Sequence, residues 1–278
     1  MDELPGLFDP DAQRLYPPET VVSLVPSVTE SLFELGMGRR VVGVTDYCTR
    51  PTDAVRYLAR MGGTKTPDIE RIVELKPDLV IANHEENRRK DVEALLEAGL
   101  QVWVTYPRKV ADTFNLLWQI MSVLETPELS ERVRHIERMY DWVWGATLAK
   151  IDVGTQPTVF APVWLDPLMT FSADTYMHDL LYVCGARGAF SDREERYPRV
   201  TFEDVEAAQP DIVLLPSEPY AFNEMHVSQF STLDIPAARH GRIHLIDGAL
   251  LTWHGTRIAH AFNELPALLE LTANDDLS

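Results

Sequence analysis

Cysteine is scarce in this chain of 278 residues, which contains two, Cys48 and Cys184. Two thiols in different halves of the sequence cannot supply a four-cysteine zinc site, and no HExxH motif occurs. The many spaced cysteines of small disulfide-stabilised domains are also missing. We therefore expect two free, mostly buried thiols.

Long apolar runs are missing as well. No stretch approaches the roughly 20 apolar residues that a membrane-spanning helix needs, so we expect no insertion into a membrane. Residues 1–19 are acidic and proline-rich, and they lack the basic start and the apolar core of about 7–15 residues that mark a signal peptide. From the residues alone, a cytoplasmic location therefore stays open.

Positive charge is in short supply, because 25 Lys and Arg residues stand against 43 Asp and Glu residues, a formal net charge of -18. Such a surface repels nucleic-acid phosphates and anionic lipid headgroups, so we expect no nucleic-acid partner. It suits solubility alone or docking on a basic partner. The glycine-rich nucleotide motifs and the GxSxG elbow are absent too, and we expect no catalytic residues.

Short apolar runs alternate with amphipathic segments along the chain, which predicts an α/β fold with parallel strands. Ser27 and Glu30 have the spacing of a helix capping box, and Thr66-Pro67 has the pattern of a helix start. The expected strands are 21–25, 41–44, 79–82, 102–105, 158–164, 212–215 and 243–246. The expected helices follow Ser27, Thr66 and Thr201 and cover 88–98, 111–124, 175–184 and 256–271.

One long amphipathic helix interrupts this alternation. A helix start at Thr126-Pro127 is followed by apolar residues at steps of three and four from Leu129 to Val143. We therefore predict two Rossmann-like lobes joined by one long α-helix. The expected boundaries are an N-terminal arm at 1–19, an N-terminal lobe at 20–124, the connecting helix at 125–154 and a C-terminal lobe at 155–278.

The two halves share an internal repeat. Glu70 and Glu203 are 133 positions apart, and the Pro-Asp pairs that begin at Pro77 and Pro210 have the same separation. The order of a helix, a proline, an aspartate and a strand is common in α/β proteins. The shared spacing of Glu, Pro and Asp nevertheless favours duplication of one unit.

The sequence resembles a known family, the class III periplasmic binding proteins of ABC importers. The likeness extends over residues 20–270 and is greatest to the vitamin B12-binding members. It lies in VVSLVPSVTESLFELGMGRRVVGVTDYCTRP, PDIERIVELKPDLVIA, MHDLLYVCGARGAF and YPRVTFEDVEAAQPDIVLLP. The resemblance implies a monomer that binds ligand in the cleft between its lobes, outside the cytoplasm, and has no intrinsic cofactor.

The resemblance also implies roles for two glutamates. In the family, one glutamate on each lobe docks on arginine pockets of the membrane permease dimer, and Glu70 and Glu203 match those positions. Paired carboxylates would form charge-assisted contacts with basic sockets. The alternative is that both glutamates are ordinary solvated residues.

Ligands of open α/β sheets bind beyond the carboxyl ends of the strands, where aromatic faces can cover a planar macrocycle. Tyr47 matches an aromatic residue that contacts the corrin in vitamin B12-binding members, and Tyr197 matches a cleft tryptophan there. Core packing is the alternative for any single aromatic residue. The predicted ligand-binding residues are Tyr47, His84, Tyr106, Trp164, Tyr197, Tyr220 and Trp253.

Two loop histidines, His84 and His254, are candidates for coordinating the cobalt or iron of a bound chelate. The alternative for each is a hydrogen-bonded or surface histidine. We expect the ligand to be a corrinoid such as cobalamin or cobinamide, with a ferric siderophore or haem as an alternative. A different class also stays open, namely a cytoplasmic enzyme or chaperone that handles a corrinoid or metal cofactor.

Overall fold

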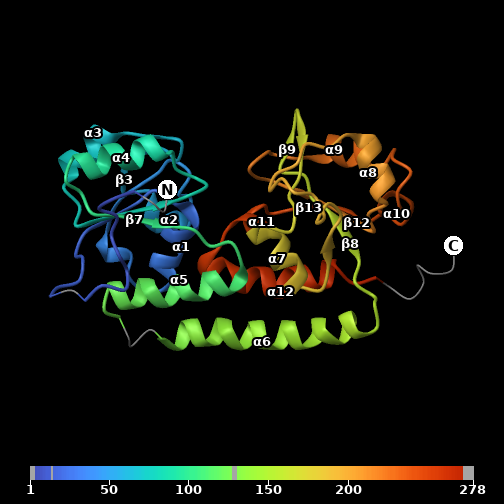
Figure 1. Ribbon diagram of the computed structural model, residues 1–278, viewed down its shortest axis with the longest axis horizontal. Helices are drawn as coiled ribbons and strands as arrows, with labels where there is room; N and C mark the ends of the chain where they lie inside the picture. Colours follow the sequence, from blue (N-terminus) through green and yellow to red (C-terminus); the bar gives the residue numbers. More distant parts are fainter. Residues whose placement is uncertain (1–3, 14, 127–129, 272–278) are drawn as a thin grey trace. The chain divides into compact units, whose positions relative to one another are not determined.

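The computed structural model describes residues 4–13, 15–126 and 130–271 (Figure 1). Its contacts divide the chain into two compact units, which are described separately. Unit 1 contains Met1–Pro107, Ala111–Ile136 and His254–Arg257, and unit 2 contains Arg108–Val110, Glu137–Trp253 and Ile258–Ser278. These units are discontinuous in sequence, whereas the predicted lobes are continuous segments, and the predicted boundaries remain predictions.

Unit 1 is an alternation of strands and helices, as the sequence predicts. Its elements are β1 (Val21–Ser23), α1 (Pro26–Glu34), η1 (Gly38–Arg40), β2 (Val41–Val44), α2 (Thr52–Val55), β3 (Ala59–Arg60), β4 (Gly62–Gly63), β5 (Thr66–Pro67), α3 (Ile69–Leu75), β6 (Leu79–Asn83), α4 (Arg89–Glu97), β7 (Val102–Thr105), α5 (Val110–Val123), which joins this unit from Ala111, and the distant turn η3 (Gly255–Arg257).

The main sheet of unit 1 has the order β3-β2-β1-β6-β7, and all its neighbouring strands are parallel. Figure 1 shows α3 and α4 on one face of this sheet and α1 on the other. Alternate strand residues such as Val22, Val80 and Val102 form one core with Ile72 of α3 and Leu95 of α4. Burial on both faces explains why these strands are short, nearly continuous apolar runs.

The N-terminal arm packs along the edge of this sheet. The backbone N–H of Phe8 donates to the carbonyl of Val102 on the edge strand β7 at 2.9 Å. The Phe8 ring lies 6.2 Å from the ring of Trp103. The described part of the arm therefore covers an edge strand that would otherwise expose its backbone.

Unit 2 also alternates strands and helices. Its elements are β8 (Thr158–Phe160), β9 (Trp164–Leu165), β10 (Leu168–Met169), α7 (Tyr176–Val183), β11 (Arg187–Gly188), α8 (Phe202–Ala208), β12 (Ile212–Pro216), α9 (Glu224–Phe230), α10 (Pro236–Arg239), β13 (Ile243–Ile246), α11 (Ala249–Thr252) and α12 (Ile258–Leu268).

The sheet of unit 2 has the order β11-β8-β12-β13 and is parallel throughout. Phe160, Val213 and Leu215 of the strands share a core with Val205 of α8 and Phe230 of α9. The single strand predicted for 158–164 is wrong, because β8 ends at Phe160 and Trp164 belongs to a separate antiparallel hairpin, β9–β10.

The predicted long helix is α6 (Ser130–Asp152), which has 23 residues. Val133, Ile136 and Val143 are its buried residues at the predicted spacing, and the chain passes from unit 1 to unit 2 after Ile136. Pro127 and Leu129, which belong to the predicted helix start, lie outside the described residues.

The internal repeat is present in three dimensions. Helices α3 and α8, and strands β6 and β12, are all related by the same shift of 133 positions. At the amino end of each pair of strands, an aspartate accepts from a threonine of the neighbouring strand. Asp78 accepts from the Thr20 N–H and hydroxyl at 2.8 and 2.9 Å, and Asp211 accepts from those of Thr158 at 2.8 and 2.9 Å.

Two predicted helix starts are wrong. Thr66-Pro67 forms strand β5, and α3 is capped instead by Asp68, whose carboxylate accepts from the Arg71 N–H at 3.1 Å. Helix α1 begins at Pro26, so Ser27 and Glu30 lie inside the helix and form no capping box. Proline is favoured in the first turn of a helix, and here it replaces the expected side-chain cap.

Candidate functional site

The carboxyl ends of the parallel strands bring the predicted ligand residues of each unit to one edge of its sheet. In unit 1, Tyr47 follows β2, His84 follows β6 and Tyr106 follows β7. In unit 2, Tyr220 follows β12, and Trp164 lies on the hairpin that follows β8. We call these two edges the aromatic edges of unit 1 and unit 2.

His84 and Tyr106 form a stacked pair on the aromatic edge of unit 1. Their ring centroids are 4.2 Å apart and their planes differ by 20°. The pairing follows from the sheet, because the His84 N–H donates to the carbonyl of Thr105 on the neighbouring strand at 2.9 Å. Both side chains are partly exposed.

Tyr47 is more exposed than this pair, at 63%. A Cβ atom added to Gly63 would lie 3.4 Å from Cε2 of Tyr47, so the ring passes close to the glycine backbone. The Asp46 N–H donates to the carbonyl of Gly62 at 2.9 Å, which ties the loop after β2 to the β4–β5 turn. Gly62 has a φ of +76°, a conformation that favours glycine.

Two cavities border the sheet of unit 1. A cavity of about 320 Å³ is lined by Tyr106 and by Asn115 and Gln119 of α5. A larger one of about 610 Å³ is lined by the N-terminal arm and by Asp78 and Gln101, which precede strands. The larger cavity therefore lies at the amino edge, opposite the predicted site, and the smaller one adjoins the aromatic edge.

Trp164 and Tyr220 meet edge to face on the aromatic edge of unit 2, with centroids 5.5 Å apart. Tyr220 also packs against Phe222 at 4.7 Å and His226 at 5.6 Å, which anchors its ring. The indole N–H of Trp164 donates to the carbonyl of Asp166 at 3.0 Å, within its own hairpin. Trp164 is 42% exposed and therefore offers its ring rather than a free N–H group.

Tyr197 lies on a strip that extends the same hairpin. The N–H groups of Thr170 and Ser172 donate to the carbonyls of Pro198 and Arg196 at 3.1 and 3.0 Å. The Arg196 guanidinium lies 5.8 Å from the Tyr197 ring centroid. Tyr197 is half-buried, so one part of its ring is available at the surface.

Trp253 is different from the other predicted contacts. Its side chain is 8% exposed, and its carbonyl accepts from the hydroxyl of Tyr176 at 3.4 Å. Trp253 is therefore buried, which fits core packing, the alternative stated for any single aromatic residue.

His254 is buried in unit 1, where the Ser27 hydroxyl lies 3.3 Å from Nδ1. Burial lowers the pKa of His254 to about 4, so the imidazole is neutral near pH 7. His84 is partly exposed, and the described part of the chain contains no group of three or more His, Cys, Asp and Glu side chains that could hold a metal ion. A metal-ligand role for either histidine therefore stays a prediction.

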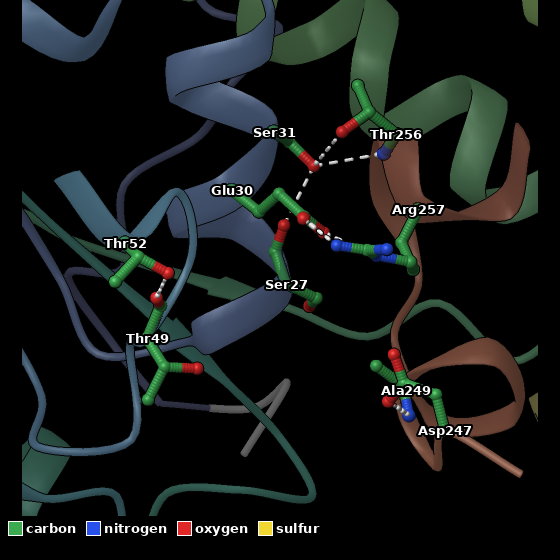
Figure 2. Close-up of polar contacts among 9 residues, drawn as sticks. All are labelled: Ser27, Glu30, Ser31, Thr49, Thr52, Asp247, Ala249, Thr256 and Arg257. Carbon is green, nitrogen blue, oxygen red and sulfur yellow. Dashed lines mark hydrogen bonds and ion pairs between the residues drawn. The ribbon is translucent and has the colours of Figure 1, made fainter. Parts of the chain in front are cut away.

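A buried polar cluster joins the segment that follows His254 to helix α1, and sequence analysis missed it. Figure 2 shows Arg257 directed at Glu30, with its Nε donating to Oε2 at 2.9 Å, and Ser31 accepting from the Thr256 N–H at 3.0 Å. Burial raises the pKa of Glu30, and the hydrogen bond and charge of Arg257 oppose that rise. No local pattern could predict this cluster, because its partners are more than 220 residues apart in the chain.

Glu70 and Glu203 occupy equivalent, exposed positions, each the second residue of its helix. Hydrogen bonds from its own N–H and the Thr201 hydroxyl lower the pKa of Glu203, so this carboxylate is ionised at neutral pH. Each glutamate is therefore free to contact a basic partner.

Cys48 and Cys184 are free and buried, as predicted. Burial raises the pKa of the Cys184 thiol to about 12. Within the described ranges, no helix combines the length and apolar character that crossing a bilayer requires.

The chain is similar in sequence to curated vitamin B12-binding proteins. It is 28% identical over 207 residues to the vitamin B12-binding protein of Pectobacterium carotovorum subsp. carotovorum strain PC1, which covers 73% of this chain and 72% of the relative. The similarity to the vitamin B12-binding protein of Vibrio cholerae strain M66-2 is 26% over 213 residues, covering 76% and 75% of the two chains.

Solved structures share the fold. The crystal structure of the periplasmic vitamin B12 binding protein BtuF of Vibrio cholerae superposes with a TM-score of 0.77 at 22% identity and covers 94% of this chain and 99% of its own. A periplasmic haem-binding protein from Pseudomonas aeruginosa also gives 0.77, at 21% identity, with 91% and 92% covered. The sequence model of the periplasmic binding protein family matches residues 21–250, most of the chain, and the chain therefore belongs to this family.

Proposed function

We propose that this protein binds a corrinoid or a similar planar metal chelate without turnover, and that the ligand contacts the aromatic edge of unit 1. The observation that carries the proposal is the partly exposed His84–Tyr106 stack, which follows the carboxyl ends of β6 and β7, where ligands of α/β sheets bind. Trp164, Tyr220 and Tyr197 supply the corresponding aromatic surface in unit 2. Trp253 is left out because its side chain is in the core.

The ligand class follows from the aromatic edges and the relatives together. Aromatic rings bury a large apolar area at small entropic cost, which suits a macrocycle. The relatives named above are vitamin B12-binding and haem-binding proteins, so haem is the second candidate ligand. We propose His84 as a candidate ligand for the metal of either one, and we propose no intrinsic cofactor.

We further propose that Glu70 and Glu203 dock the loaded protein on an ABC importer permease. Both carboxylates are exposed at equivalent places in the repeat, and charge-assisted bonds from arginine would suit them. This role implies a protein that works outside the cytoplasm, as the relatives described as periplasmic do. A binding protein that releases its ligand unchanged needs no catalytic residues.

A titration of the purified protein with cyanocobalamin, dicyanocobinamide, haemin and a ferric siderophore tests the proposal. We expect one of these probes to saturate the protein at one equivalent, with a shift of its visible absorption. Tyr106→Ala should weaken the binding, whereas Tyr57→Ala, which removes a tyrosine that is 76% exposed elsewhere in unit 1, should not. If cyanocobalamin, dicyanocobinamide and haemin all fail to bind, the proposed function is wrong, and binding of the siderophore alone would favour the alternative ligand class.

A further inference from the structure

Asn87 connects three loops at the aromatic edge of unit 1. Its side-chain carbonyl accepts from the Asn83 N–H at 2.7 Å. Its amide group lies 2.9 Å from the carbonyl of Thr64 and 3.5 Å from that of Leu24. These partners lie at the last residue of β6, in the turn between β4 and β5, and directly after β1, while Asn87 itself belongs to the loop after β6. Asn87 itself is 3% exposed, so a ligand cannot reach most of it.

Asn83 extends this network to strand β7. Its amide donates to the Thr105 hydroxyl at 3.3 Å, just before Tyr106. Its side-chain oxygen accepts from the N–H groups of Glu85 and Glu86 at 2.8 and 3.2 Å, which shapes the loop that carries His84. The stack of His84 on Tyr106 therefore rests on the Asn83–Asn87 pair.

Arg60 holds the backbone of the loop that carries Tyr47, as Asn83 and Asn87 hold the loop that carries His84. Its guanidinium donates to the carbonyls of Thr45 and Cys48 at 2.8 and 3.0 Å, and to that of Val55 at 3.2 Å. Three carbonyls on one guanidinium fix the backbone on both sides of Tyr47. Tyr47 in turn lies against Gly63, next to the Thr64 carbonyl that Asn87 holds.

From these contacts we infer that Asn87 and Arg60 are positioning residues that hold the ligand surface of unit 1 in its binding shape before the ligand arrives. The inference rests on the proposed function. Loops that are already ordered lose less conformational entropy on binding, so a preformed surface binds more tightly. Substitution of Asn87 or Arg60 keeps the proposed contact residues Tyr47, His84 and Tyr106 in the chain. It frees the backbone that orients their side chains.

The amide of Asn87 has a specific chemical requirement. It needs an acceptor toward Asn83 and a donor toward Thr64, which the Asn side chain supplies together. In Asn87→Asp, an ionised carboxylate keeps the acceptor and places negative charge against the Thr64 carbonyl. Protonation would restore a donor, and burial raises the pKa of a carboxyl group, so this variant should recover at lower pH.

The test compares Asn87→Ala with Asp78→Ala in the full chain. Asp78 is a matched control, because it also ties segments of unit 1 with side-chain hydrogen bonds, but at the amino edge. The probe is whichever of cyanocobalamin, dicyanocobinamide and haemin saturates the unmodified protein. We expect Asn87→Ala to raise the Kd about tenfold or more, the effect of supporting residues in other sites, and Asp78→Ala to leave it within about twofold.

Two further measurements separate positioning from general stability. Asn87→Asp should bind the probe more weakly at pH 8 than at pH 5, relative to the unmodified protein. Without any ligand, hydrogen exchange at Glu85 and Glu86 should accelerate in Asn87→Ala and not in Asp78→Ala. Arg60→Lys, which keeps the charge but cannot reach three carbonyls, should accelerate exchange at Cys48.

The outcomes are distinguishable from failure of the proposed function. If the unmodified protein binds a probe and Asn87→Ala binds it equally well, the inference is wrong and the proposed function stands. Equal losses of affinity in Asn87→Ala and Asp78→Ala would also overturn the inference, because they would reflect stability alone. If the unmodified protein binds none of the probes, the proposed function fails and the inference falls with it.

Discussion

Glu30 and Arg257, 227 residues apart in the chain, form a two-point ion pair inside unit 1. Their side chains are 3% and 10% exposed. Arg257 belongs to a short segment, His254–Arg257, that joins unit 1 although its neighbours in sequence belong to unit 2. The pair therefore fixes this segment to helix α1.

Arg257→Ala should destabilise the protein by about 3 kcal/mol, because it leaves the Glu30 carboxylate buried without its partner. Urea denaturation at pH 7 measures the loss. Arg239→Ala is a suitable control, since Arg239 pairs with Asp234 at the surface and its loss should cost less than about 1 kcal/mol. Similar losses in both variants would contradict a buried, mutually dependent pair.

His254 should make the stability depend on pH between about 4 and 6.5. Its pKa is lowered from 6.5 to about 4 in the folded protein, so below pH 6.5 the unfolded chain binds a proton that the folded chain does not. The stabilisation is complete above pH 6.5 and is lost as the pH falls toward 4, by roughly 3 kcal/mol in total.

The matched variant for this prediction is His254→Gln, whose amide cannot titrate in this range but can still bond to the Ser27 hydroxyl. The difference in unfolding free energy between the two proteins, measured at pH 4.5 and pH 7, isolates His254 from Glu30 and other groups. A constant difference across this range would show that the imidazole is not held neutral.

Glu70→Ala and Glu203→Ala together should reduce uptake through the cognate permease by about tenfold or more, because each removes one charge-assisted contact. Ligand affinity should stay unchanged, since both glutamates lie on exposed helix starts. Glu74→Ala is the control, as Glu74 is exposed on the same helix α3. Normal uptake by the double variant would remove the docking role.

Trp164→Ala should weaken ligand binding by about 1–2 kcal/mol, about tenfold, because the ring supplies apolar contact area. Trp164→Phe should keep most of the affinity, since the indole N–H is already bonded to Asp166. Trp142→Ala provides the comparison, because Trp142 is 74% exposed on α6. Absorbance titration measures all three, and equal affinities for Trp164→Ala and Trp142→Ala would contradict the role of the hairpin.

Much of the fold is predictable because it follows from local periodicity. Apolar runs locate β2, β7 and β13 with their observed bounds, and helical spacing locates α6. The shift of 133 positions between Glu70 and Glu203 predicts a duplicated unit, and the Thr–Asp bonds at the amino edges repeat it. The resemblance to periplasmic binding proteins is confirmed by the family match.

The errors arise where contacts with other residues override the pattern of a short segment. Thr66-Pro67 has a helix-start pattern, but pairing with Gly62 and Gly63 makes it a strand. Glu30 has a capping-box position, but it pairs with Arg257 instead. Placement after a predicted strand puts Tyr47, His84 and Tyr106 at one edge of the sheet, and their contact with ligand stays a prediction. It cannot tell that Trp253 is buried, because burial depends on how α7 and α11 pack.

The central claim is that the protein holds a planar metal chelate and releases it unchanged. Equilibrium dialysis against cyanocobalamin, dicyanocobinamide or haemin, followed by denaturation and mass spectrometry of the released compound, tests both parts at once. We predict one equivalent bound, with its mass unaltered after prolonged incubation. If the protein retains none of these compounds, or if the recovered compound is chemically modified, the account is contradicted.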